Sequence, residues 1–393
     1  MQTQALCGAR IFTGSEFLDH HAIVQTAGRV ERVCPVDEVE PEIQRLTLHG
    51  GVLAPGFIDL QTNGGGGVLF NNAPTIQSLQ TMLTAHRKGG TTALLPTLVT
   101  DKVSVQEQAL AAVLRAVDDG FDSVLGVHFE GPFLDIERRG VHREDYVRTM
   151  TDQDVDWLAS ITQCRVLLTL APEHVLPGQI KTLTDAGVIV CAGHSAGSYQ
   201  QTMNAIAEGL SGFTHVFNAM SPLGSREPGV VGAALSDTSS WCGIIVDCHH
   251  VHPATVSIAL RAKPRGKLYL VTDSMATVGS DTKSFELYGK TIRERDGRLV
   301  NHEDRLAGSA ISMIDAVRAT HEVVGVPLDE SLRMASLYPA QFIGESEQRG
   351  RIETGFRADI VHFDERFDVL NTWVAGEQRS HTTESEFNES RHT

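Results

Sequence analysis

Short hydrophobic, β-branched runs alternate with amphipathic segments through the middle of the chain. The hydrophobic runs are typical of buried parallel strands, and they fall at residues 92–95, 123–127, 165–170, 188–191, 243–246 and 267–271. Between them, apolar residues recur at helical spacing in residues 105–117, 199–208 and 312–323. This alternation predicts repeated βαβ units. Their number favours an α/β fold closed as an eight-stranded (β/α)8 barrel of the TIM type over an open sheet.

The two ends of the chain show a different pattern. Residues 5–53 contain short strand-like pieces, such as 22–25 and 29–33, separated by glycine-containing turns, and residues 350–364 and 369–376 repeat this pattern. We predict that both ends pair into one small, discontinuous β-sandwich. The expected organisation is residues 1–53 and 346–381 in the sandwich, residues 54–345 in the barrel, and a polar, mobile tail over residues 382–393.

Composition narrows the class of protein. The 393 residues include 33 basic and 49 acidic side chains, for a net charge of −16, and no stretch mixes Lys and Arg with aromatics. These features exclude a nucleic-acid partner. No apolar run is long enough to cross a membrane, and the start does not resemble a signal peptide. The six cysteines are scattered without a Cys-x-x-Cys pair, so we expect a cytoplasmic protein without disulfides or zinc-thiolate sites.

Four polar residues follow separate hydrophobic runs, where barrel strands would end. They are Glu130, His194, His215 and Asp273. Active sites of parallel barrels lie at these carboxyl ends, and one carboxylate with two imidazoles is enough to hold a divalent metal ion and leave room for water. Asp273 would then act on that water. Any one of these residues alone is as readily a buried structural acid or a core histidine, but their joint occurrence favours the metal site.

The motifs around these positions resemble a known family. The segment from Val52 to Leu60 is similar to the first barrel strand of the amidohydrolase superfamily, in which a His-x-His metal pair usually follows; here that position reads Gln61-Thr62-Asn63. Within the superfamily, the chain is similar to the N-acetylglucosamine-6-phosphate deacetylases. The matching stretches are residues 64–67, 128–133, 215–220, 226–229 and 306–309, which occur in the right order. The resemblance runs from the β module at the start through the barrel to the closing strands, so it covers nearly the whole chain.

The resemblance assigns roles to the catalytic residues. It implies one divalent ion on Glu130, His194 and His215, with Gln61 and Asn63 as the remnant of a second metal site or as supporting residues. Zinc is the expected ion, although the same donors accept iron(II), cobalt(II) or manganese(II). Asp273 becomes the general base and then the general acid, because an amide nitrogen leaves only when it is protonated.

The resemblance also implies a sugar-phosphate pocket. His142 is expected to donate to the carbonyl oxygen and His250 to the phosphate, whereas His128 is expected to be structural. Arg226 would bind the phosphate through its guanidinium fork, from the neighbouring subunit of a homodimer. The remaining contacts would come from Val141, Asn218, Ala219, Leu306, Ala307 and Gly308. The glycines at 64–67 are not read as a phosphate-binding P-loop, since no Gly-Lys-Ser/Thr follows.

The implied reaction is hydrolysis of N-acetyl-D-glucosamine 6-phosphate to glucosamine 6-phosphate and acetate, a step of amino-sugar catabolism and cell-wall recycling. The same reaction on the galactosamine epimer stays open, because motifs do not report one inverted hydroxyl. Deamination or cyclic-amide hydrolysis is disfavoured by Gln61, Asn63 and the Arg226 motif. In a catalytically silent, metal-free scaffold we would expect one or more of the four central residues to be replaced, yet all four are present.

Overall fold

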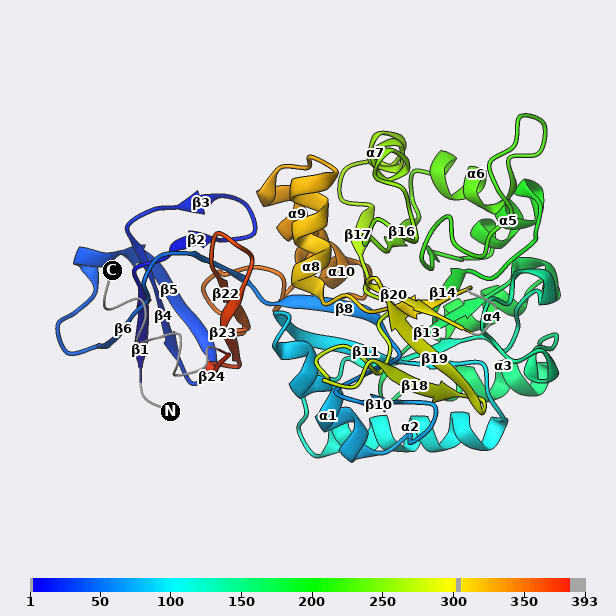
Figure 1. Cartoon of the computed structure of the whole chain (residues 1–393), viewed down its shortest axis with the longest axis horizontal. Helices are drawn as coiled ribbons and strands as arrows, with labels where there is room; N and C mark the ends of the chain where they lie inside the picture. The colour runs from blue at the N-terminus through cyan, green and yellow to red at the C-terminus, as the bar shows by residue number, and fades with distance from the viewer. Residues whose placement is uncertain (1–2, 302–304, 382–393) are drawn as a thin grey trace.

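The computed structural model describes residues 3–301 and 305–381, and its larger part is the predicted (β/α)8 barrel (Figure 1). Eight parallel strands follow one another around it: β8 (Phe57–Thr62), β11 (Thr91–Val99), β12 (Gly126–Glu130), β13 (Arg165–Leu170), β14 (Ile189–Ala192), β15 (Gly212–Phe213), β16 (Trp241–Ile244) and β17 (Leu268–Leu270). A parallel bridge between Thr62 and Ser274 joins the last strand to the first. Helices cover the outside and side chains fill the inside, so these strands are almost wholly buried.

The helices lie around the barrel (Figure 1). They are α1 (Ile76–Arg87), α2 (Val103–Asp118), α3 (Asp152–Ala159), α4 (Gln179–Asp185), α5 (Tyr199–Ala207), α6 (Gly229–Ser236), α7 (Pro253–Ala262), α8 (Met313–Arg318), α9 (Leu328–Ala335) and α10 (Leu337–Phe342). The helix expected over residues 312–323 is α8 followed by a π-helical turn, Ala319–Val323. Local sequence fixes several starts: at α5, the Ser198 and Gln201 side chains form a reciprocal capping box.

Both chain ends build the small β domain beside the barrel (Figure 1). One sheet has the order β5-β4-β1-β6 and the other β24-β23-β22-β7-β2-β3. Their strands are β1 (Gln4–Cys7), β2 (Arg10–Phe12), β3 (Phe17–Leu18), β4 (His21–Thr26), β5 (Arg29–Pro35), β6 (Gln44–Thr47), β7 (Val52–Pro55), β22 (Ile360–Phe363), β23 (Val369–Val374) and β24 (Glu377–Ser380).

The pairing within the second sheet confirms that the two ends form one domain. Strand β7 is parallel to β2 and antiparallel to β22, so residues from both ends hydrogen-bond side by side. Leu6, Ile11, Ile23 and Trp373 belong to one buried apolar cluster. The division of the chain at residue 53 falls within β7 and stays a prediction, and the tail at residues 382–393 lies outside the described residues.

A four-stranded antiparallel sheet is inserted between β17 and α8, and the sequence patterns did not predict it. Its strands are β18 (Ser284–Leu287), β19 (Lys290–Arg295), β20 (Arg298–Val300) and β21 (Leu306–Ser309). Leu287, Ile292 and Leu299 pack with Val99 and Met275 in one apolar cluster, which holds the insert against the carboxyl end of the barrel. A short hairpin of β9 (Gly64–Gly65) and β10 (Val68–Leu69) follows β8. In the described part of the chain, no helix is long and apolar enough to cross a membrane.

Candidate active site

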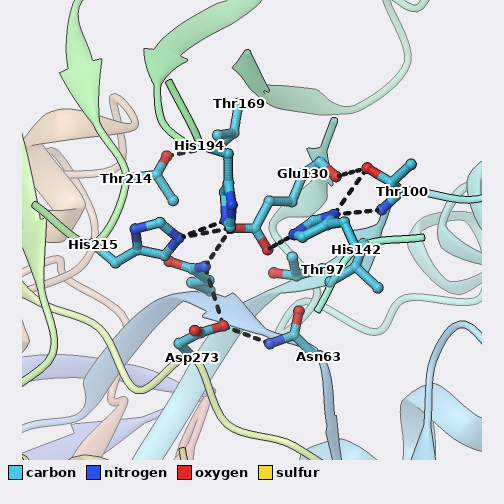
Figure 2. A network of polar contacts seen from close by, with 12 residues as sticks. Asn63, Thr97, Thr100, Glu130, His142, Thr169, His194, Thr214, His215 and Asp273 are labelled. Atoms are coloured by element: carbon cyan, nitrogen blue, oxygen red, sulfur yellow. Dashed lines mark hydrogen bonds and ion pairs between the residues drawn. The ribbon is translucent and has the colours of Figure 1, made fainter. Parts of the chain in front are cut away.

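Three side chains from neighbouring strand ends converge on one point inside the barrel mouth (Figure 2). Glu130 is the last residue of β12, while His194 and His215 each follow a strand end by two residues. The Nε2 atoms of His194 and His215 lie 3.1 and 3.0 Å from Glu130 Oε1, and 3.0 Å from each other. All three side chains are buried. The structure therefore brings together the three residues predicted as metal ligands.

Backbone geometry immediately after the strands aims these side chains. His194, His215 and Asp273 have φ angles of 50°, 36° and 52°, in a left-handed region that non-glycine residues rarely adopt. Such backbone conformations persist when the surroundings hold them, and they cluster at functional sites. Here the His194 carbonyl accepts from the Asp135 N–H at 2.8 Å, and the Asp273 carbonyl accepts from the Ser309 N–H at 2.9 Å.

The donor atoms fit a divalent cation. His194 Nδ1 lies 2.8 Å from the Arg138 carbonyl, which only accepts, so the ring proton is on Nδ1 and Nε2 presents a bare electron pair to Glu130 Oε1. Two electron-pair donors at this distance repel unless a cation lies between them. One carboxylate and two imidazoles are ligands that catalytic zinc sites use.

Asp273 lies beside this cluster with one oxygen committed to protein contacts. Its Oδ1 accepts from Asn63 Nδ2 at 2.6 Å and from Gln61 Nε2 at 3.1 Å, and the residue lines the cavity. Burial, together with the negative charge of Glu130, raises its pKa to about 6. A carboxyl group with that pKa both accepts and returns protons near neutral pH.

Gln61 and Asn63 hold the acidic side chains of Glu130 and Asp273 in place. Gln61 Nε2 donates to Glu130 Oε1 at 3.1 Å as well as to Asp273, so it bridges the ligand and the candidate base. Both amide side chains are fully buried and do not line the cavity. Their N–H groups point at carboxylates, an arrangement that orients the two acids.

His142 is a neutral hydrogen-bond donor at the edge of the cluster. The Thr100 backbone N–H donates to His142 Nδ1 at 3.2 Å, so the ring proton is on Nε2, which lies 3.9 Å from Glu130 Oε2 (Figure 2). Burial and the neighbouring His194 lower its pKa to about 3. The ring is thus uncharged at neutral pH and has one N–H to give.

Threonines that the sequence interpretation did not single out hold these rings. Thr100 positions His142, and His128 sits between Thr97 Oγ1 at 3.2 Å and Thr169 Oγ1 at 2.8 Å. Burial lowers the pKa of His128 to about 4, and the residue does not line the cavity. The signal was present, since Thr97, Thr100 and Thr169 all fall at or near a strand end.

The histidine cluster at residues 249–252 resolves into separate positions. His250 lines the cavity, and its Nδ1 lies 2.6 Å from Asp247 Oδ2. Burial would raise the pKa of Asp247, but the hydrogen bond and charge of His250 outweigh it and lower the pKa to about 2. His252 instead accepts from the Ala254 N–H at the start of α7, and neither it nor His249 lines the cavity.

These groups share one cavity of about 300 Å³. Its lining contains most of the predicted pocket: Glu130, Val141, His142, His194, His215, Asn218, Ala219, His250, Asp273, Leu306 and Gly308. Ala307 lies within strand β21 of the inserted sheet and is buried, and Arg226 is exposed on a loop before α6, outside this lining. Glu137, Arg138 and Arg305 line the cavity although the sequence motifs did not point to them.

Family comparison places the chain among known hydrolases. The profile of the amidohydrolase family matches residues 52–379, and that of the NagA composite domain matches residues 4–53. The chain belongs to the amidohydrolase family. In this amidohydrolase, Gln61 and Asn63 stand at the end of β8, where the usual histidine pair would be, and among the described residues the one cluster of three converging ligands in the cavity is Glu130, His194 and His215.

Individual relatives of this amidohydrolase span its whole length. It is 41% identical to an N-acetylgalactosamine-6-phosphate deacetylase of Shewanella sp. (strain ANA-3), with 94% of each chain covered. It is 37% identical to an N-acetylglucosamine-6-phosphate deacetylase of Haemophilus influenzae, covering 95% of this chain and 98% of the relative. The crystal structure of N-acetylglucosamine-6-phosphate deacetylase from Pasteurella multocida superposes with a TM-score of 0.93 at 38% identity, covering 96% of this chain and 100% of that one.

Proposed function

We propose that this amidohydrolase removes the acetyl group of N-acetyl-D-glucosamine 6-phosphate, giving D-glucosamine 6-phosphate and acetate. The observation that carries the proposal is the convergence of Glu130, His194 and His215 beside Asp273 in one cavity. Full-length relatives named as deacetylases of N-acetylated hexosamine 6-phosphates support the substrate class. The reaction belongs to amino-sugar catabolism and cell-wall recycling, and six unpaired cysteines agree with a cytoplasmic location.

Glu130, His194 and His215 would hold one divalent ion, for which we propose zinc; iron(II), cobalt(II) and manganese(II) suit the same donors. When bound, such an ion supplies Lewis-acid activation of a water molecule and polarisation of the acetyl carbonyl. The hydrogen bond from His194 Nδ1 to the Arg138 carbonyl orients that ligand. Contacts of this kind around metal ligands strongly affect metal affinity.

Asp273 performs the proton transfers in this proposal. Because Asn63 and Gln61 occupy Oδ1, its other oxygen would take a proton from the attacking water and return it to the amide nitrogen as the C–N bond breaks. His142 would donate its Nε2–H to the carbonyl oxygen as negative charge develops there, which stabilises the transition state.

The sugar phosphate would occupy the outer part of the cavity. Val141, Asn218, Ala219 and the backbone of Leu306, Ala307 and Gly308 would contact the sugar, and His250 would contact the phosphate. We propose that Arg226 of a second subunit completes the phosphate site in a homodimer. Its exposed position outside its own chain's cavity supports this arrangement.

The galactosamine epimer is a second candidate substrate. A specific observation favours it, since the relative from Shewanella, at 41% identity, is named as the deacetylase of that epimer. The two sugars differ by one inverted hydroxyl, and discrimination at a hydroxyl depends on whether the site leaves a buried polar group unpaired.

An acetate-release assay with both epimeric sugar phosphates, run beside metal analysis of gently purified protein, tests these proposals. We expect turnover of the glucosamine derivative with the higher kcat/KM. A higher kcat/KM for the galactosamine derivative would reverse the assignment of the substrate. If metal-loaded protein releases acetate from neither sugar phosphate, the chain is a catalytically silent scaffold.

A further inference from the structure

Two consecutive arginines in the loop after β12 have different surroundings. Arg139 forms an ion pair with Glu144 at 2.9 Å, and its Nη1 donates to the Ile136 carbonyl at 2.7 Å. Arg138 lines the catalytic cavity, is half-buried, and forms no ion pair with any described residue. Its Nε is buried without a hydrogen-bond partner in the described part of the chain. At the site where the substrate would bind, this guanidinium thus has no ion-pair partner among the residues that the structure describes.

The main chain fixes the position of Arg138. The Asp135 N–H donates to the His194 carbonyl at 2.8 Å, and His194 Nδ1–H donates back to the Arg138 carbonyl at 2.8 Å. Asp135 also accepts from the Glu137 N–H and from His174 Nε2. The loop is thus attached to a candidate metal ligand at two points. The long Arg138 side chain starts beside the reacting centre, and no described residue forms an ion pair with it that would pull it away.

A buried hydrogen-bond donor without a partner costs free energy unless a ligand accepts its hydrogen bond. A guanidinium has only donors and matches the oxygens of phosphate or carboxylate. The proposed substrate carries one anionic group, its phosphate, with a charge of about −1.5 to −2 at neutral pH. That dianion must enter a chain of net charge −16, into a cavity that also holds Glu130 and Asp273. One arginine from a partner subunit would leave about 0.5 to 1 unit of that negative charge uncompensated.

We propose that Arg138 binds the substrate's phosphate in its own subunit's site, as a second cation beside Arg226 of the partner subunit. This inference rests on the proposed function for the identity of the ligand. It makes phosphate recognition partly independent of the dimer, because one of the two cations comes from the chain that also supplies Asp273.

The test compares Arg138→Gln and Arg138→Lys with Arg139→Gln as the matched control. Each variant keeps the backbone carbonyl that holds His194. For Arg138→Gln we expect kcat/KM on the sugar phosphate to fall about ten- to a hundredfold, mostly through KM, as for a lost charge-assisted contact. This loss should exceed the loss on the unphosphorylated N-acetyl sugar at least tenfold. Inorganic phosphate should inhibit the variant more weakly, Arg138→Lys should recover part of the loss, and Arg139→Gln should behave as wild type.

Three results would overturn the role of Arg138. An equal loss on both substrates would place the side chain at the acetyl end or the sugar. Loss of bound metal from Arg138→Gln would show that the residue supports His194 instead. An equal loss of kcat/KM in Arg139→Gln would show that the effect comes from removing any positive charge in this loop. If wild-type protein releases acetate from neither sugar phosphate, the proposed function fails, and calorimetric titration with inorganic phosphate then decides about Arg138. Affinity at least tenfold weaker in Arg138→Gln supports the cation site, and unchanged affinity overturns it.

Discussion

Asp273 has an oxygen for proton transfer because its other oxygen is already satisfied. Asn63 and Gln61 both donate to Oδ1, so an asparagine at 273 would keep its shape with its own Oδ1 accepting these contacts. We predict that Asp273→Asn retains metal and substrate binding but lowers turnover by roughly two to four orders of magnitude, as expected for a lost general acid and base. Steady-state acetate release, with metal analysis of the same sample, measures this. Near-normal turnover would remove Asp273 from the mechanism.

The metal prediction concerns His194 and His215. Since Gln61 and Asn63 direct N–H groups at carboxylates, we predict close to one tightly bound divalent ion per chain. Replacing either histidine with alanine leaves two ligands, so the ion and the activity should be lost together. Elemental analysis after dialysis, with His128→Ala as a buried histidine outside the cluster, tests this. Two tightly bound ions in the wild type, or normal metal content in both ligand variants, would contradict the assignment.

At this scale, the sequence was most informative where chemistry restricts residue types. Glu130, His194, His215 and Asp273 were predictable because each follows a hydrophobic run, and the barrel brings strand ends together. Arg138 was not, since a loop arginine is usually a solvated charge and only the fold shows that its neighbour Arg139 is paired while it is not.

At the scale of elements, a buried aspartate spans the junction that closes the barrel. Asp59 on β8 accepts from the Thr272 hydroxyl at 2.5 Å and the Thr272 N–H at 3.3 Å, just beyond β17. Burial raises the pKa of Asp59 to about 7. Because this pKa lies above the unfolded value of about 3.9, the stability contributed by Asp59 is fully present below pH 4 and is lost as the pH rises through 7.

Asp59→Asn should therefore change how stability depends on pH. An asparagine can accept the hydrogen bond of the Thr272 hydroxyl with its amide oxygen, and it never becomes charged. We predict that the free energy of unfolding of the variant, measured relative to the wild type, rises by one to a few kcal/mol from pH 5 to pH 8. Denaturant unfolding at both pH values measures the difference, and each protein serves as its own control. The same gap between the two proteins at pH 5 and pH 8 would show that Asp59 does not titrate in this range.

Element prediction succeeded where both faces of a strand are buried. Continuous apolar runs such as 165–170 correspond directly to β13, whereas inserted strands such as β18 alternate apolar with polar residues: Phe285 and Leu287 alternate with Ser284 and Glu286. One of their faces is solvated, so their apolar content is low and short alternation is easily missed. The same insert carries Leu306 and Gly308 into the cavity, which motif resemblance found without revealing the sheet.

At the scale of the whole molecule, the loop before α6 is held in place, but Arg226 on it does not line its own chain's cavity. Glu227 Oε1 accepts from the Tyr199 N–H at 2.7 Å and the Gly229 N–H at 3.0 Å, which holds the loop, while Leu223 is 59% exposed and Arg226 is exposed. A preformed loop of this kind loses little conformational freedom when it docks. We therefore expect it to insert into the site of a second subunit.

Arg226→Ala tests the phosphate contact. A charge-assisted contact of a guanidinium with phosphate is worth about 1.5–3 kcal/mol, so kcat/KM for the phosphorylated sugar should fall roughly ten- to a hundredfold. The loss should be at least tenfold smaller for unphosphorylated N-acetylglucosamine. Steady-state kinetics on both substrates measures the ratio. An equal loss on the two would show that Arg226 does not bind the phosphate.

Subunit mixing separates a contact made across the dimer from one made within a chain. In a heterodimer of Arg226→Ala and Asp273→Asn chains, the first chain keeps its own Asp273 and would receive Arg226 from the partner. One site per heterodimer should then work, which amounts to about a quarter of all sites in a random one-to-one mixture of a two-fold symmetric dimer. Neither parent homodimer contains a site with both groups, so activity should rise as the subunits exchange. If confirmed heterodimers show no such gain, Arg226 serves its own subunit, and the loop before α6 would have to move toward its own cavity to reach the phosphate.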